Sequence, residues 1–68
     1  MQIQPQPTKI IRIATVIERT GLSKTFIYKM IRRGEFPPSV RIAPRYAGWV
    51  ESEVNSWLNE RIAAVRGQ

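Results

Sequence analysis

The sequence contains no cysteine, no histidine and no aspartate. Without cysteine, neither a disulfide nor a thiolate metal site can stabilise the fold. Without histidine, the usual zinc and haem ligands and imidazole acid–base catalysis are missing. Five glutamates supply the side-chain carboxylates, and their spacing forms no inward-facing pair. We therefore expect neither an enzyme nor a bound metal or cofactor, and apolar packing must stabilise the fold.

Long apolar runs are also absent. None approaches the roughly 18 residues that identify a membrane-spanning helix, and the N-terminus lacks the charged and apolar regions of a signal peptide. The expectation is a cytoplasmic protein without membrane association. With 68 residues, the chain should form one domain. A domain of this size buries only about 60% of the surface that its unfolded chain exposes, which leaves little room for a substrate cavity.

Positive charge is abundant by contrast. Eleven lysines and arginines outnumber the five glutamates, which gives a net charge of +6 and an isoelectric point of about 10.9. A small and strongly basic domain favours a polyanionic partner such as nucleic acid. The alternative is that the excess cations only keep the protein in solution. The distribution of the charges along the chain must decide between the two.

The first half of the sequence predicts two short helices joined by a turn. Residues 1–8 are rich in glutamine and proline and should form a flexible arm before a domain over residues 9–66. Residues 9–13 are either a strand or an extended lead-in. The T-x-x-E capping box from Thr15 to Glu18 predicts a helix from Thr15 to about Thr20, and Gly21 then reverses the chain. Ser23 should cap a second helix over residues 24–33, which Gly34 ends.

The second half predicts a β-hairpin followed by a long helix. Residues 39–42 and 46–50 form short strands, with a loop at 43–45. The last helix should run from about residue 51 to residue 65. Its apolar residues recur at helical spacing, so it should pack on the core along its length. These residues are Val54, Trp57, Leu58, Ile62 and Val65. Trp49 should also belong to the core.

The helix over residues 24–33 has two different faces. At about 100° per residue, an apolar arc and a hydrogen-bonding arc lie opposite each other. Phe26, Ile27, Met30 and Ile31 form the apolar arc, and Thr25, Tyr28, Lys29 and Arg32 form the hydrogen-bonding arc. No acidic residue lies between Ser23 and Gly34, although a solvated helix face usually alternates its charges. A face with cations and hydroxyl groups but no acids favours contact with phosphates and base edges. The alternative is an ordinary solvent-exposed face with no binding role.

The hairpin carries Arg41 on its first strand and Arg45 at its tip. Arginines at the end of a hairpin that follows a recognition helix are typical of a wing that reaches the DNA backbone or minor groove. The alternative is a hairpin that closes the core, with Arg45 solvated. Two interpretations of Tyr46 remain open, since its ring suits either stacking on a sugar or covering the core.

Two stretches of the sequence resemble a known family. They are TGLSKTFIYKMIRRGEFP at residues 20–37 and GWVESEVNSWL at residues 48–58, with VRI between them. These stretches are similar to AlpA-type prophage regulatory proteins and to small phage excisionases with a MerR-like winged helix-turn-helix. The similarity covers roughly residues 10–65 and implies a DNA-binding domain from a prophage or mobile element. It places the recognition positions at Ser23, Lys24, Thr25, Tyr28 and Lys29, and the wing at Arg41 and Arg45. Phe26 departs from the small polar residue expected there, so contact and core both remain open for it.

The combined prediction is a small α+β fold, mostly helical, of the winged helix-turn-helix class: two short helices, a hairpin wing and a C-terminal helix. Lys24, Lys29 and Arg32 should contact phosphates of duplex DNA. Thr25 and Tyr28, with one of the two lysines in part, should reach base edges. Ser23 should both cap its helix and hold a phosphate. Arg41 and Arg45 should bind the flanking backbone.

The predicted function is sequence-specific regulation of transcription of phage or integrase genes. One alternative is an excisionase that bends attachment-site DNA and works with a phage integrase. An alternative from another class is a basic interaction module that inhibits an acidic partner protein. A single short domain has a small footprint on DNA, so cooperative self-association on repeated sites is a further expectation.

Overall fold

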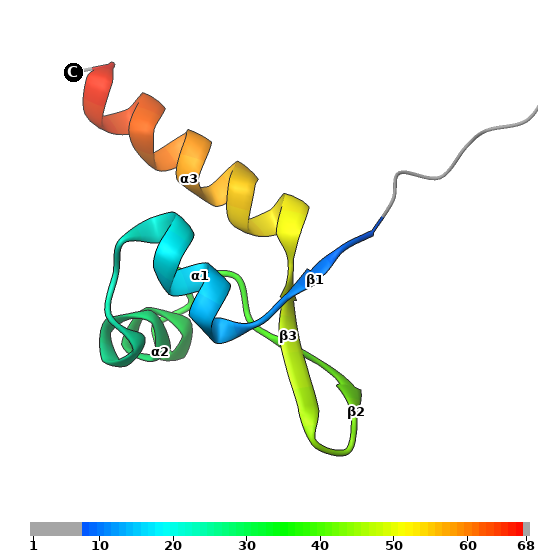
Figure 1. Ribbon diagram of the computed structural model, residues 1–68. Coiled ribbons are helices and arrows are strands. Elements are labelled where there is room, and N and C mark those ends of the chain that lie inside the picture. Colours follow the sequence, from blue (N-terminus) through cyan, green and yellow to red (C-terminus); the bar gives the residue numbers. More distant parts are fainter. Residues whose placement is uncertain (1–7, 68) are drawn as a thin grey trace, which may run out of the picture.

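The computed structural model describes residues 8–67, so the predicted arm over residues 1–8 lies outside the described residues except for Thr8. The fold is α+β and mostly helical, as predicted. Figure 1 shows two short helices on one side of a small sheet, a projecting hairpin and a long C-terminal helix. In chain order the elements are β1 (Ile10–Ile11), α1 (Ile13–Thr20), α2 (Lys24–Arg32), β2 (Val40–Ala43), β3 (Tyr46–Val50) and α3 (Glu51–Arg66).

The sheet is antiparallel, with strand order β1-β3-β2. Strand β1 pairs with the end of β3, where Ile10 lies opposite Val50 and Ile11 opposite Trp49. This close approach requires Gly48, because a Cβ atom there would collide with the Ile10 side chain and lie 2.8 Å from the carbonyl oxygen of Ile11. Within residues 9–13, Ile10 and Ile11 form a two-residue strand, Arg12 follows, and Ile13 is the first residue of α1.

Helix α1 begins at Ile13, so the prediction that it starts with a capping box at Thr15 was wrong. Its N-cap is Arg12, whose side chain makes no capping hydrogen bond. The Arg12 carbonyl accepts a hydrogen bond from the Val16 N–H at 3.0 Å. Pairing of β1 with β3 ends at Ile11, and the chain turns into the helix at once. Thr15 consequently lies within the first turn, where it cannot act as the cap.

The predicted turn at Gly21 and the predicted start of α2 are confirmed, and α2 ends at Arg32, one residue earlier than predicted. Gly21 adopts a left-handed conformation with φ of 74°, and its N–H donates to the Ile17 carbonyl at 2.8 Å. Ser23 caps α2 by accepting a hydrogen bond from the Phe26 N–H at 3.1 Å. Gly34, with φ of 73°, ends the helix in the arrangement known as a Schellman motif. In it, the N–H of Glu35 donates to the Met30 carbonyl at 2.8 Å.

The hairpin is shifted slightly from its predicted position. Strand β2 starts at Val40 and continues to Ala43, so the connecting turn consists of Pro44 and Arg45. The register changes between Arg41 and Ala43, which indicates a bulge. The far end of the hairpin is exposed, with relative exposures of 59% for Ile42 and 58% for Tyr46. Because this end covers no core, the hairpin projects as a wing would.

The core lies between the sheet, the helices and the segment after α2. Its buried side chains are Ile11, Val16, Ile27, Met30, Phe36, Trp49 and Val54. Two indoles hold the chain that follows α2, because Trp49 Nε1 donates to the Pro37 carbonyl at 2.9 Å and Trp57 Nε1 donates to the Glu35 carbonyl at 2.7 Å. The Phe36 ring meets Trp57 edge-on, with ring centroids 4.7 Å apart. The prediction that Trp49 belongs to the core is confirmed.

Helix α3 packs on the core only at its beginning, so the prediction of core packing along its whole length was wrong. Val54 is fully buried, whereas Ile62 and Val65 are 46% and 72% exposed. An ion pair of 2.7 Å between Arg19 and Glu51 joins the start of α3 to α1. The remainder of α3 extends past the other elements (Figure 1). Among the described residues, no helix is long and apolar enough to cross a membrane.

We expect Gly48→Ala to lower the free energy of unfolding by about 1–3 kcal/mol, the usual cost of overpacking. The added methyl group would force β1 away from β3, because the Ile11 carbonyl cannot rotate away as a side chain can. Urea denaturation followed by circular dichroism measures the change. Ala47→Ser, at an exposed neighbouring position on the same strand, is the control and should stay within about 0.5 kcal/mol of the parent. Equal stability of Gly48→Ala and the parent would contradict the close packing of β1 against β3.

Candidate nucleic-acid interface

Helix α2 presents the predicted hydrogen-bonding face to solvent. All of its predicted contact residues are exposed, while Ile27 and Met30 on the opposite side are 0% and 4% exposed. The helical period therefore predicted the orientation of α2 correctly at these positions. The residues predicted to contact DNA from α2 and its cap, all of them exposed, are Ser23, Lys24, Thr25, Tyr28, Lys29 and Arg32.

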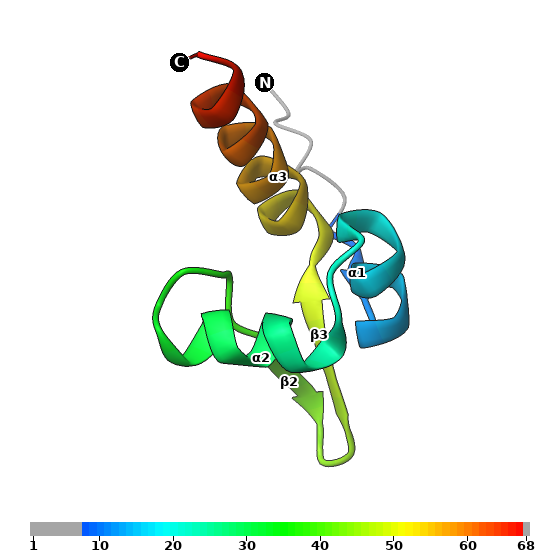
Figure 2. The same cartoon turned by 90° about the vertical axis from the view of Figure 1, so that its left-hand side faces the viewer.

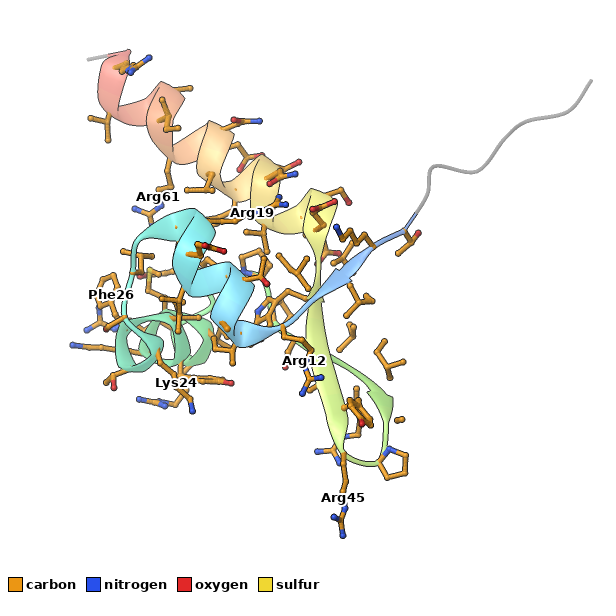
Figure 3. All side chains as sticks on the ribbon, viewed as in Figure 1. Arg12, Arg19, Lys24, Phe26, Arg45 and Arg61 are labelled. Atoms are coloured by element: carbon orange, nitrogen blue, oxygen red, sulfur yellow. The ribbon has the colours of Figure 1, made fainter. Side chains whose placement is uncertain are left out.

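Phe26 is the exception to the predicted faces. The sequence places it on the apolar arc, but 44% of its surface is exposed. It lines an open groove of about 360 Å³ together with Trp57 and Leu58 of α3. Helix α3 leaves α2 at this side without covering it, so Phe26 projects outward beside Arg61 (Figure 3). Phe26 is therefore not a buried core residue.

Tyr28 is exposed and yet restrained by the core. Its relative exposure is 37%, and its ring centroid lies 6.1 Å from that of Trp49. Aromatic rings at this separation and tilt attract each other weakly. Trp49 therefore limits the directions in which Tyr28 can point from α2.

The capping serine keeps a free hydrogen-bond donor. Ser23 Oγ accepts the hydrogen bond from the Phe26 N–H, and the side chain is exposed. A hydroxyl group that accepts one hydrogen bond still has its O–H to donate. The geometry is compatible with both predicted roles of Ser23, as a cap and as a phosphate contact at the start of α2.

The two arginines of the hairpin differ in their surroundings. Arg41 Nη1 donates to the Pro44 carbonyl at 3.3 Å, so its side chain folds along the turn. Arg45 points away from the hairpin tip into solvent (Figure 3). Both side chains are exposed. One arginine thus braces the turn and the other extends the reach of the hairpin.

Arg12 is a candidate contact that the sequence analysis missed. Its guanidinium lies 5.0 Å from the centroid of the Tyr46 ring, within the range of a cation–π interaction. Figure 3 shows Arg12, Lys24 and Arg45 directed toward the same end of the molecule, away from α3. Tyr46 is 58% exposed and does not cover the core, whereas stacking of its ring on a sugar stays a prediction. A basic residue just before a helix was the signal in the sequence, but only the pairing of β1 with β3 places it beside the hairpin.

Positive charge therefore gathers around two projections, α2 and the hairpin. Figure 2 shows α2 lying across the hairpin, whose tip extends beyond it. The five glutamates belong to other segments: Glu18 lies on α1, Glu51 pairs with Arg19, and the other three line a pocket around Trp57. A helix and an adjacent hairpin that both carry cations match the way in which winged helix-turn-helix domains contact DNA, with the helix in the major groove and the hairpin on the neighbouring backbone.

Sequence comparisons identify proteins that this chain is similar to. A family model described as "Prophage CP4-57 regulatory protein (AlpA)" matches residues 9–62. The chain is 42% identical over 55 residues to "Uncharacterized protein ORF88" of Enterobacteria phage P4. This match covers 81% of this chain and 62% of that protein. The chain therefore spans about three fifths of the length of this relative. It is 29% identical over 59 residues to "DNA-binding transcriptional activator AlpA" of Escherichia coli (strain K12), covering 78% of this chain and 84% of that protein.

A further relative matches almost from end to end. "Probable excisionase hkaC" of Shigella phage Sf6 is 30% identical over 67 residues, which cover 98% of this chain and 100% of that protein. The family model spans most of the chain, including β1, α1, α2, the hairpin and the first three turns of α3. The chain belongs to the AlpA family of prophage regulatory proteins.

Proposed function

We propose that the protein is a sequence-specific duplex DNA-binding regulator of phage or integrase genes, acting in the cytoplasm without catalysis or cofactor. The observation that carries the proposal is the exposed face of α2, which lies beside the hairpin; neither residues 23–34 nor residues 39–50 contain an acidic residue. The name of the Escherichia coli relative, a DNA-binding transcriptional activator, supports it. Lys24, Lys29 and Arg32 bind phosphates, and Thr25 and Tyr28 read base edges.

The cations around the hairpin extend this contact. Arg45 reaches the flanking backbone, and Arg41 stiffens the turn that carries it while remaining exposed for a phosphate of its own. Arg12 binds a phosphate between α2 and the hairpin. A guanidinium that stacks on an aromatic ring through its face keeps the N–H groups at its edge free to donate. Tyr46 thus orients Arg12 without competing for the phosphate.

A second candidate function is that of an excisionase, which bends attachment-site DNA so that an integrase removes a prophage. The observation in its favour is the relative named as a probable excisionase, which matches over its whole length. In this role the phage integrase is a partner, and copies of the chain bind repeated sites cooperatively. Footprinting combined with a bending assay on the surrounding DNA separates the candidates. Protection upstream of a promoter supports transcriptional control, whereas strong bending with protection inside an attachment site supports excision.

The affinity for duplex DNA should fall steeply as salt is added. Each phosphate contact contributes a slope of about −0.9 in a plot of log association constant against log salt concentration. Lys29→Ala should therefore reduce the slope by about 0.9 in fluorescence anisotropy titrations. The matched control is Arg66→Ala, which removes a cation at the far end of α3. On a duplex short enough to bind only one protein molecule, this variant should leave the slope unchanged. A slope near zero for the parent protein would refute DNA binding and favour the protein-interaction module.

Base discrimination should depend on the middle of α2. Thr25→Ala and Tyr28→Phe should each reduce the preference for the specific site by about 1–3 kcal/mol while nonspecific affinity persists. Phenylalanine is chosen because it keeps the ring that contacts Trp49 and removes only the hydroxyl group. Competition with unrelated duplexes measures the preference. If both variants discriminate as well as the parent, base readout lies on another part of the protein.

Arg12→Ala should weaken DNA binding by roughly 1.5–3 kcal/mol, the usual contribution of a hydrogen bond to a charged group. Tyr46→Leu should cause a smaller loss, because Arg12 remains but is no longer held by the ring. Combining the two substitutions should add little to the loss from Arg12→Ala alone, since both act through the same guanidinium. Strictly additive losses would show that Tyr46 contacts DNA independently.

A further inference from the structure

The end of α3 presents an apolar surface that no described part of the chain covers. Every residue from Asn59 to Gly67 is exposed. Two apolar and two basic side chains line a shallow pocket of about 300 Å³ here, and we call this surface the α3 tip. The α3 tip consists of Arg61, Ile62, Val65 and Arg66. Apolar side chains held on a rigid helix between cations form a surface that suits an apolar and anionic partner.

A larger pocket, of about 530 Å³, lies between the segment after α2 and the first turns of α3. Phe36, Pro37 and Trp57 form its apolar part. Three of the five carboxylates of the chain line it as well, although the protein as a whole is strongly basic. These are Glu35, Glu53 and Glu60, and we call this surface the acidic pocket.

The two surfaces face in different directions from the same helix. With Glu51 at 0°, Glu53 and Glu60 lie at about 200° and 180° around α3, whereas Ile62 and Val65 lie at about 20° and 320°. The α3 tip of one molecule therefore cannot enter its own acidic pocket. When one tip and one pocket of a pair of copies are engaged, a free tip and a free pocket remain, so the contact extends into a filament or closes into a ring.

We propose that copies of this chain associate head to tail, with the α3 tip of one copy in the acidic pocket of the next. Apolar side chains then meet the half-buried Pro37 and Trp57, and Arg66 approaches the carboxylates of the pocket. A two-fold contact between two tips would instead bring Arg61 and Arg66 of both copies together, which like charges oppose. The interface leaves Lys24 and Arg45 free, because α3 extends away from them (Figure 3). This interface specifies which surfaces would make the self-association proposed above, and its formation does not require DNA.

Sedimentation equilibrium of the full chain without DNA tests the interface. At physiological salt, where exposed charges are screened beyond about 8 Å, the apparent mass should rise with protein concentration beyond that of a dimer. The tip variant Val65→Glu/Arg66→Glu reverses the charge of the tip and leaves Arg61 on Trp57. The pocket variant Glu35→Arg/Glu60→Arg reverses the pocket at two exposed residues. Each should weaken association by about tenfold. Circular dichroism checks that both variants remain folded.

An equal mixture of the two variants provides the sharpest control. The acidic tip of one then matches the basic pocket of the other, while the remaining tip and pocket are unchanged, so the mixture should recover the association of the parent. Recovery in the mixture with failure in each variant alone supports the head-to-tail interface. A parent that stays monomeric at millimolar concentration, association that stops at the dimer, or a mixture that behaves like its separate components would overturn it. The salt dependence of DNA binding by each variant is measured separately, so failure of this interface and failure of DNA binding are distinguishable.

Discussion

The position of Trp49 determines how α2 and the hairpin are arranged. This side chain belongs to β3 and is 2% exposed. Its ring lies beside Tyr28 of α2, and its Nε1 donates to the Pro37 carbonyl in the segment that leaves α2. Because β3 is also the central strand of the sheet, one indole links the helix, its following segment and the hairpin. A domain with a core this small has few other ways to fix two projections relative to each other.

The features predicted correctly from the sequence depend on residues close together in the chain. Ser23 caps α2 and Gly34 ends it. A capping hydroxyl group and a glycine with positive φ each bond backbone groups only a few residues away, so their effect can be predicted from the local sequence. The errors arise where distant segments compete with local patterns. Strand β1 pairs with β3 and starts α1 before the capping box, and α3 leaves the core although its apolar period continues through Ile62 and Val65.

The same distinction applies to the candidate site. The exposure of the predicted contact residues on α2 follows from helical periodicity, so an exposed face could be predicted from the sequence. Arg12 could not, because its partner Tyr46 lies far along the chain and approaches only through the pairing of β1 with β3. Phe26 was misplaced for a related reason: periodicity orients a side chain on its helix but does not tell whether another element covers it. Here α3 leaves an open groove over that position.

The separation of charge within the molecule has a consequence for assembly on DNA. A protein with a net charge of +6 repels its own copies in solution. Phosphates neutralise the cations of α2 and the hairpin on bound molecules, which removes much of this repulsion at the moment when two copies lie side by side. The carboxylates of the acidic pocket, set apart from that surface, remain free to attract the α3 tip of a neighbour. Weak attraction between free molecules can then become effective cooperativity on adjacent sites, because DNA supplies both the neutralising charge and a high local concentration. A head-to-tail contact would also require neighbouring sites to point in the same direction, whereas a two-fold contact would require inverted ones.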